Sequence, residues 1–316
     1  MAKIEKAGAP NQNTVGNVGD IYVDTITGRE FELVSIIGVK TDKDTRYLYE
    51  WDLIIEEAGG GSSESDEIIK QFVEGTLVEV ANEEITRIAA YKFRESSLET
   101  IDCPNVTEIG EYAFYKCESL KNLTVNPTIN IGDYAFKDCI SLETIDFPLL
   151  SGKIGSSGFR GCTALMKVNI PNVTKLGSNS FDTCLGLETI DFPLATLDGG
   201  YVFYSCINLK SCKLPEVTAL TTKAFANCKR LTMLEFPKVK WLRESYIFQN
   251  CTSLNKLVLG EESGVAQLAV TNAFENTPIA NGTGYIYVPD DLVESYKTAT
   301  NWVTYADQIK GLSELE

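Results

Sequence analysis

The chain has 316 residues, 44% of them hydrophobic, and carries a formal net charge of −16 at pH 7. A chain this acidic is not expected to bind nucleic acid or anionic membrane surfaces, because both bind proteins through clustered lysine and arginine side chains. Histidine is absent, which removes the commonest general base at neutral pH, the commonest metal ligand and every Ser-His or Cys-His nucleophile pair. We therefore expect a protein that is not an enzyme, with no catalytic residues, no metal site and no cofactor.

Residues 1–54 differ from the rest of the chain and predict a small antiparallel β domain that anchors or oligomerises the protein. Residues 20–24 and 31–37 flank a Thr-Gly turn, and residues 47–54 alternate apolar with polar side chains, so we expect three strands that pair in turn. Three short strands make a marginal core. This domain is therefore expected to gain stability from self-association or from docking on a larger assembly.

A linker is expected at residues 55–67, where clustered glycines and serines have the composition of a flexible hinge. Residues 1–10 lack the about 7 to 15 apolar residues of a secretory signal, so no Sec-type export is expected. No run of about 20 apolar residues occurs, and we expect no membrane insertion.

Residues 68–280 repeat the phrase Phe-x-x-Cys-x-x-Leu at steps of 22 or 23 residues. A fixed period of this length is the signature of a solenoid in which one supersecondary unit stacks on itself. An atypical first coil, with Leu77, Val80, Ile85, Ile88 and Phe93, is expected to cover the first core layer. The phrase begins at Phe114, Phe136, Phe159, Phe181, Phe203, Phe225 and Phe248.

Each coil begins with a strand, which leads into a tight bend and a turn. The period-two pattern predicts that Leu142, Ile145 and Phe147 face inward, while Thr144 and Asp146 face outward. A proline then ends the strand, and the segment Ala-Phe-x-x-Cys predicts a short helical turn.

Seven of the nine cysteines hold one phase of the repeat. Stacked coils place equivalent residues about 4.8 Å apart with parallel side-chain directions, whereas a disulfide needs Cβ atoms about 3.8 Å apart that point toward each other. We therefore interpret these cysteines as free thiols that pack as small hydrophobic side chains. They are Cys117, Cys139, Cys162, Cys184, Cys206, Cys228 and Cys251.

Residues 281–316 predict a C-terminal cap. Residues 285–289 are expected to form the final strand, and residues 290–309, with Tyr296 and Trp302, are expected to be mostly helical. A solenoid needs such an element to cover its last core layer.

Residues 131–148 read Ile-Gly-Asp-Tyr-Ala-Phe-Lys-Asp-Cys-Ile-Ser-Leu-Glu-Thr-Ile-Asp-Phe-Pro and resemble the BspA-like, or treponemal, subclass of leucine-rich repeats. The closing segment, with Tyr287-Val-Pro289, Tyr296 and Trp302, is similar to the element that follows such arrays. The resemblance implies an α/β, strand-rich fold: a leucine-rich repeat solenoid with a small N-terminal β domain and a C-terminal helical cap. It also implies a surface or secreted adhesin that contacts host proteins and usually begins with a signal peptide.

Residues 8–54, especially Gly19-Asp-Ile-Tyr-Val-Asp24 and Tyr49-Glu-Trp51, resemble the short β modules near the start of bacteriophage and prophage tail or fibre proteins. This resemblance implies a tail-associated receptor-binding protein, located in the virion tail and assembled as a homotrimer. Its partners would be a bacterial envelope protein or glycan as ligand, and other tail proteins through residues 1–54. The alternative is a BspA-like adhesin on the bacterial cell surface that binds host protein or glycan, and an enzyme that cleaves glycans is a third hypothesis.

Outward strand positions supply the candidate binding residues. One row, which includes Glu99, Lys121 and Glu143, alternates in charge between neighbouring coils, and such pairs contribute roughly 0.2 to 1 kcal/mol each, so a structural role suffices there. The rest of the face combines polar side chains with tyrosines, such as Tyr115 and Tyr204, that suit a sugar or a protein or else merely cover the turns. The candidates are Thr100, Asp102, Asn122, Thr144, Asp146, Lys167, Thr189, Asp191 and Glu235.

Overall fold

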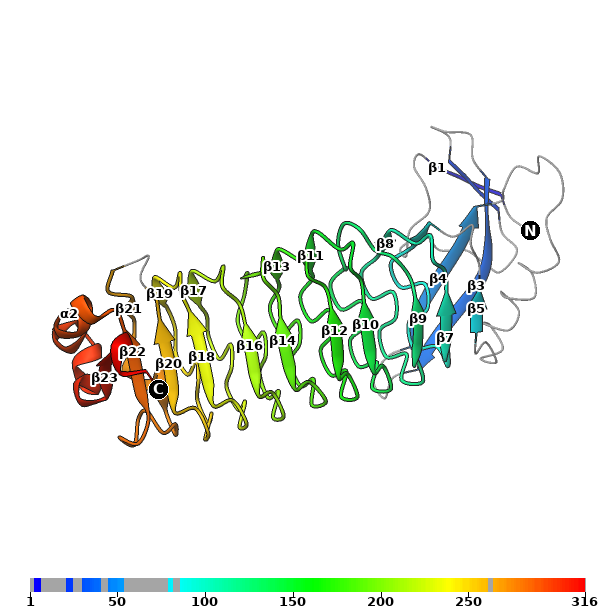
Figure 1. The fold of residues 1–316 in the computed structure, drawn as a ribbon. Helices are drawn as coiled ribbons and strands as arrows, with labels where there is room; N and C mark the ends of the chain where they lie inside the picture. The colour runs from blue at the N-terminus through cyan, green and yellow to red at the C-terminus, as the bar shows by residue number, and fades with distance from the viewer. Residues whose placement is uncertain are drawn as a thin grey trace. The chain divides into compact units, whose positions relative to one another are not determined.

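The computed structural model describes residues 3–6, 21–24, 30–40, 45–53, 79–81, 86–260 and 264–315. The chain divides into two compact units, Met1–Glu74 and Gly75–Glu316 (Figure 1). The expected linker at residues 55–67 lies outside the described residues, as do Leu77, Ile85 and the side chain of Val80 in the expected first coil.

The first unit contains one sheet whose strands follow the order β1-β2-β3-β4. The β2–β3 and β3–β4 pairs are antiparallel, whereas β1 is parallel to β2. The sequence analysis did not predict β1, because its four residues, Lys-Ile-Glu-Lys, contain a single β-branched side chain. The bounds are β1 (Lys3–Lys6), β2 (Ile21–Asp24), β3 (Glu30–Lys40) and β4 (Thr45–Leu53).

The second unit is a strand-rich parallel solenoid with little helix. Each coil contributes one strand to a long side of the stack, and every pairing among these strands is parallel (Figure 1). These strands are β5 (Glu79–Ala81), β7 (Thr100–Asp102), β9 (Asn122–Thr124), β10 (Thr144–Asp146), β12 (Lys167–Asn169), β14 (Thr189–Asp191), β16 (Ser211–Lys213), β18 (Met233–Phe236), β20 (Lys256–Leu259), β22 (Tyr285–Val288) and β23 (Ile309–Gly311).

A second side of the solenoid is formed by strands of two residues, which also pair in parallel from coil to coil. A proline lies between the longer strand and the two-residue strand in the coils of β8, β11, β13, β15, β17 and β19. The two-residue strands are β6 (Arg87–Ile88), β8 (Glu108–Ile109), β11 (Lys153–Ile154), β13 (Lys175–Leu176), β15 (Thr196–Leu197), β17 (Ala219–Leu220), β19 (Trp241–Leu242) and β21 (Gln267–Leu268).

The third side consists of consecutive tight turns, so the expected short helical turn is wrong for all coils but the last, where Thr271–Phe274 form a short 3-10 helix. Within one coil, the N–H groups of Tyr115 and Cys117 donate to the carbonyl oxygens three residues earlier, at 3.2 and 3.0 Å. Tyr112 and Lys116 have φ values of +54° and +55°, which no α-helix tolerates. The N–H of Phe114 donates to the next coil instead, so hydrogen bonds between coils satisfy a backbone that a helix would have satisfied internally.

The interior is filled by the repeated apolar positions, as expected. Phe114, Cys117 and Leu120 are completely buried, and Leu142 and Phe147 are at most 1% exposed. One phenylalanine from each coil stacks on the next, with ring centroids 5.0 to 6.0 Å apart from Phe114 to Phe248. Because each ring stacks on the equivalent ring of the next coil, the stack keeps successive coils aligned.

After the last repeat, the chain forms short helical segments and returns to the sheet. The expectation that residues 285–289 form the final strand is wrong, because β23 follows and pairs in parallel with β22. The single α-helix among the described residues is six residues long. The helical elements are η2 (Thr271–Phe274), η3 (Asp290–Leu292), α2 (Val293–Thr298), η4 (Trp302–Gln308) and η5 (Leu312–Glu314).

Buried aromatic side chains from these segments cover the last phenylalanine of the stack. Trp302 is completely buried, and its indole N–H donates to the carbonyl oxygen of Ala266 at 2.6 Å. Its ring lies 6.2 Å from that of Phe274. Tyr305 meets the same ring edge-on at 5.1 Å. The apolar end of the core is therefore shielded from water.

Candidate functional site

The nine candidate residues all lie on one surface, which we call the strand face. It comprises the outward side chains of the ten strands from β7 to β23. Three rows cross it: the residue that precedes each strand, the first strand residue and the third. Lys310 continues the third row, because it pairs with Tyr287. Thr100 is half-buried, and the other eight candidates are exposed.

The first row of the strand face carries the ion pairs that the sequence predicts. Lys121 lies 3.2 Å from Glu99, and Lys210 lies 2.7 Å from Glu188. The hydrogen bond from the Lys210 ammonium, together with its charge, lowers the pKa of the Glu188 carboxyl below its ordinary value. These contacts join adjacent coils, which confirms the structural role assigned to this row.

Candidate residues in the other rows also bond to the neighbouring coil. The Asn169 amide donates to Asp146 at 2.7 Å, and the ammonium of Lys213 lies 3.8 Å from Asp191. Only exposed side chains take part, so each contact contributes little to stability and leaves its charge available to a partner. The strand face is therefore an array of ordered, exposed polar groups and not an enclosed site.

The exposed part of the third row is interrupted at β20 and β22 and resumes at Lys310. Val258 and Tyr287 continue it by register, yet each is only 4% exposed. In the first strand position the face continues with Met233, Lys256 and Tyr285, which the sequence analysis did not select. Their place in the repeat was the signal that could have identified them.

The tyrosines of the first coils mainly cover the turns. Tyr112 stacks between Tyr91 and Tyr134, with ring centroids 5.0 and 4.6 Å away and planes 8° and 12° apart. Both faces of Tyr112 are therefore occupied by its neighbours. Desolvation by this packing raises the pKa of Tyr91 and of Tyr112 above the ordinary value.

A second group of tyrosines surrounds a lysine. The ammonium of Lys223 lies 5.6 Å from the ring centroids of Tyr201 and Tyr246 and 6.0 Å from that of Tyr204. Such cation–π contacts are worth about 0.5 to 1 kcal/mol at exposed sites. Lys223 occupies the position in its coil that Tyr201 and Tyr246 occupy in the neighbouring coils, and it stabilises the same stacked turns.

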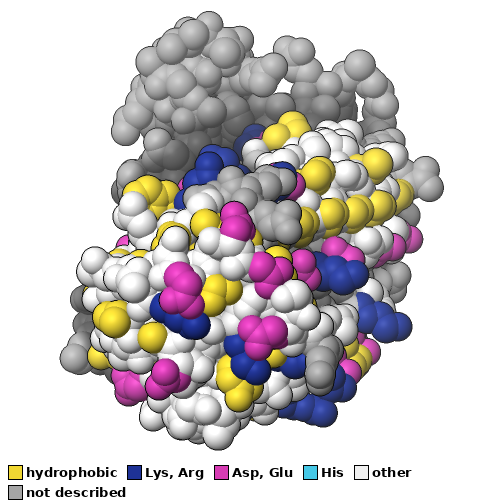
Figure 2. Space-filling view, turned by 60° about the vertical axis from the view of Figure 1, so that its left-hand side comes forward, with side chains coloured by type: hydrophobic (Ala, Val, Ile, Leu, Met, Phe, Trp, Pro, Cys, Tyr) yellow, Lys and Arg dark blue, Asp and Glu magenta, His cyan; other side chains and the backbone are white. Residues whose placement is uncertain are grey.

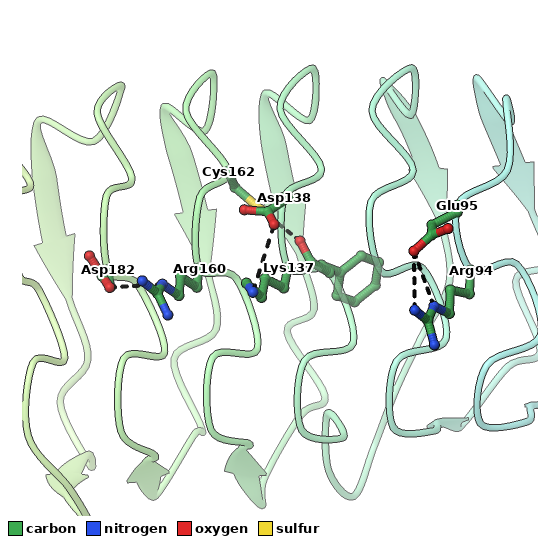
Figure 3. Close-up of polar contacts among 8 residues, drawn as sticks. Arg94, Glu95, Lys137, Asp138, Arg160, Cys162 and Asp182 are labelled. Carbon is green, nitrogen blue, oxygen red and sulfur yellow. Dashed lines mark hydrogen bonds and ion pairs between the residues drawn. The ribbon is translucent and has the colours of Figure 1, made fainter. Parts of the chain in front are cut away.

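Charged side chains on the turns pair with one another (Figure 3). Arg94 contacts Glu95 at 3.2 Å, and Arg160 contacts Asp182 at 3.0 Å. The Asp182 side chain is only 4% exposed and also accepts a hydrogen bond of 2.6 Å from the Thr183 hydroxyl. These pairs hold the turns and leave no unpaired carboxylate in an enclosed position among them.

None of the nine cysteines forms a disulfide and all nine are buried, so the seven cysteines of the repeat phase are free thiols, as predicted. Burial raises the pKa of Cys117 to about 11 and that of Cys251 to about 12. The thiolate is the reactive form, so these groups are inert at neutral pH. The residues that the structure describes contain no group of three or more His, Cys, Asp or Glu placed to hold a metal ion. A search of the same residues finds no helix long and apolar enough to cross a membrane.

Residues 86–198 and 199–286 match the family described as "BspA type Leucine rich repeat region", in six copies. The two segments together make up more than half of the chain. No curated protein matches the sequence.

Several solved structures are similar to this chain. The T. pallidum leucine-rich repeat protein TpLRR is 25% identical over 49% of this chain and 78% of that chain, with a TM-score of 0.42. A leucine-rich repeat protein from Bacteroides ovatus is 18% identical over 82% of this chain and 76% of that one, with a TM-score of 0.43. A leucine-rich cell surface protein from Faecalibacterium prausnitzii is 15% identical over 92% and 98%, with a TM-score of 0.28.

Proposed function

This chain belongs to the BspA-type leucine-rich repeat family, and from that premise we propose that it is a non-enzymatic binding or adhesion protein on the bacterial cell surface. Solenoids of stacked repeats present extended surfaces to partners. The resemblance described in the sequence analysis implies a surface adhesin, which most members of this family are. The ligand class is a host protein or a glycan.

The observation that carries this proposal is the strand face. Its candidate residues form ordered rows of hydroxyl, amide, carboxylate and ammonium groups, and eight of the nine are exposed. Neighbouring coils bond through these groups, as at Asn169 and Asp146, so the rows are held in place before a partner arrives. Preorganised groups lose less entropy on binding.

A binding assay with the full chain tests the proposal. Labelled protein is applied to host cells, extracellular matrix proteins and a glycan array, and retention is compared between the wild type and Thr144→Arg and Thr189→Arg. Both threonines are exposed in the middle of the strand face, so a bulky cation there should reduce retention at least ~10-fold. Thr218→Arg is the matched control, because Thr218 is exposed just before β17 on another side of the coil. Equal retention by all four proteins would rule out the strand face.

A second candidate function is that of a phage or prophage tail-associated receptor-binding protein. It is supported by the resemblance of residues 8–54 to tail modules, with those residues as the attachment to other tail proteins and as the site of homotrimer formation. The ligand would then be a bacterial envelope protein or glycan. Electron microscopy of virions labelled with antibody against residues 75–316 distinguishes the two candidates, because tail label supports this one and label on intact bacteria supports the adhesin.

A further inference from the structure

The strand face divides into two halves of opposite charge. The outward positions of β7, β9, β10, β12 and β14 hold six acidic and two basic side chains. Those of β16, β18, β20 and β22, together with Lys310 on β23, hold one acidic and four basic side chains. The acids of the first half are Glu99, Asp102, Glu143, Asp146, Glu188 and Asp191, and the bases of the second half are Lys210, Lys213, Lys256 and Lys310.

The two halves contain five strands each. A twofold axis that passes between β14 and β16 therefore places the acidic half of one copy on the basic half of a second copy. If that axis runs parallel to the strands, it reverses the order of the coils and leaves each row opposite itself. Then β14 of one copy faces β16 of a second copy, β12 faces β18, β10 faces β20 and β7 faces β23. Because stacked coils share a rise of about 4.8 Å, all of these strands meet at once.

Opposite charges meet at the centre of this arrangement. Glu188 of one copy faces Lys210 of the second in the first row, and Asp191 faces Lys213 in the third. The four side chains are 43% to 73% exposed, so each ammonium can contact one carboxylate in its own chain and another across the interface. The twofold axis repeats every contact, which gives a network of eight charges.

The flanking strands add further contacts. Row by row, Met166, which is 50% exposed, faces Thr232, and Met233, which is 37% exposed, faces Lys167. Asn169 faces Glu235, the one acid of the basic half. At the ends, Asp102 on β7 faces Lys310 on β23, whose ammonium lies 3.9 Å from the centroid of the Tyr285 ring.

We propose that the strand face docks antiparallel on the strand face of a second copy of this chain. The three rows measure about 10 Å across and the ten coils about 45 Å along the axis, and only Val258 and Tyr287 of the third row are already buried within the chain, so the contact buries at most on the order of 1,000 Å² in total. This area is at the lower end of specific interfaces, and with its many charges it predicts a reversible dimer that is sensitive to salt. The proposal rests on the binding role proposed above and adds a second copy of the chain as a further partner of the same face: copies anchored at the same end on two cells would meet in this orientation.

Complementary charge reversals test the pairing. Asp191→Lys places lysine opposite Lys213 of the second copy, and Lys213→Glu places glutamate opposite Asp191, so each variant alone should weaken the dimer at least ~10-fold. An equimolar mixture of the two variants restores opposite charges at both positions and should dimerise again. Lys175→Glu is the matched control, because Lys175 is an exposed lysine on β13, outside the strand face.

Sedimentation velocity of the full chain in low salt gives the readout. We expect the wild type, Lys175→Glu and the mixture to have at least twice the mass per particle of either single variant, because every chain in a particle carries one strand face. We also expect 0.5 M NaCl to lower the wild-type mass to that of the single variants. Equal masses for wild type and single variants, or no recovery in the mixture, would overturn the proposal. If no dimer forms but the wild type is still retained on cells or ligands in the earlier binding assay, the strand face binds a partner other than a second copy. If both assays fail, the binding role is overturned as well.

Discussion

The thiol of Cys139 donates a hydrogen bond of 3.0 Å to the carbonyl oxygen of Phe114, in the preceding coil. The same carbonyl accepts the N–H of Cys117 at 3.0 Å, so one oxygen joins its own turn to the next coil. The six other cysteines of this phase repeat the bond, from Cys117 at 2.8 Å to Cys251 at 3.0 Å. The cysteine of the repeat is therefore both a small apolar filler and a donor along the stack.

Removal of one such thiol should destabilise the solenoid. Cys184→Ala deletes a completely buried sulfur and its 3.1 Å hydrogen bond to Phe159, so we expect a loss of about 1 to 3 kcal/mol in the free energy of unfolding. Urea unfolding followed by circular dichroism measures it. Ile140→Ala, at a side chain that is 43% exposed, is the control and should change stability by less than about 0.5 kcal/mol. A cysteine variant as stable as the control would contradict the role of the thiol ladder.

The buried thiols also predict alkaline sensitivity. Burial raises the pKa of Cys117 to about 11 and that of Cys251 to about 12 in the folded protein, while an exposed thiol in the unfolded chain titrates near about 8.5. The unfolded state therefore loses protons first, and stability should be constant below that pH and fall as the pH rises toward 11. Thermal unfolding between pH 7 and 10.5 tests this, and a midpoint that does not change above pH 8.5 would refute it.

Thiol accessibility provides an independent measurement. All nine cysteines are buried, so a disulfide reagent at pH 8 should react with none of them in the native protein and with all nine in denaturant. Rapid labelling of the native protein would show that the coils open or that the thiols are less buried than described.

One buried hydroxyl lacks a partner and should be dispensable. Ser180 is completely buried, and its Oγ makes no hydrogen bond with any described residue. Ser180→Ala removes the unsatisfied group at a position where Ala113, Ala135 and Ala224 stand in other coils, so we expect a gain of about 1 kcal/mol. Ser178→Ala, at a half-buried residue two positions earlier, is the control for alanine substitution in this turn. A destabilised Ser180→Ala would show that the hydroxyl has a partner after all.

Alanine substitution at two glycines in the left-handed region distinguishes the cost of backbone strain from the cost of steric contact. Gly161 and Gly264 have φ values of +75° and +64°, so alanine is strained at both, by about 1 kcal/mol. At Gly161 the added Cβ would also lie 2.3 Å from the Asp138 carboxylate, whereas at Gly264 it meets nothing within 4 Å. We expect Gly161→Ala to lower the thermal midpoint clearly more than Gly264→Ala. Equal shifts would mean that the Asp138 side chain moves aside without cost.

The core of the solenoid could be predicted from the sequence because its signal is periodic. A phenylalanine, a cysteine and a leucine at fixed spacing leave one way to bury all three in every coil, and the burial of Phe114, Cys117 and Leu120 follows. The alternation around Leu142 likewise assigned Thr144 and Asp146 to the exposed side. The turns could not be predicted, because tyrosine and lysine carry no signal for positive φ. Hydrogen bonds to the next coil stabilise that conformation at Tyr112 and Lys116.

The sequence by itself determined the repeat, the inward residues, the free thiols and the alternation of Glu99 with Lys121, since each depends on contacts between equivalent positions of adjacent coils. Only the tertiary structure decided how the strand face ends. Lys310 directly follows residues 290–309, which were expected to be mostly helical and not to lead into a strand, yet β23 pairs with β22 and places Lys310 beside Tyr287 in the third row. The physical reason is that this pairing satisfies the exposed backbone edge of β22, a requirement that involves two segments separated by the helical elements between them and leaves no periodic trace in the chain.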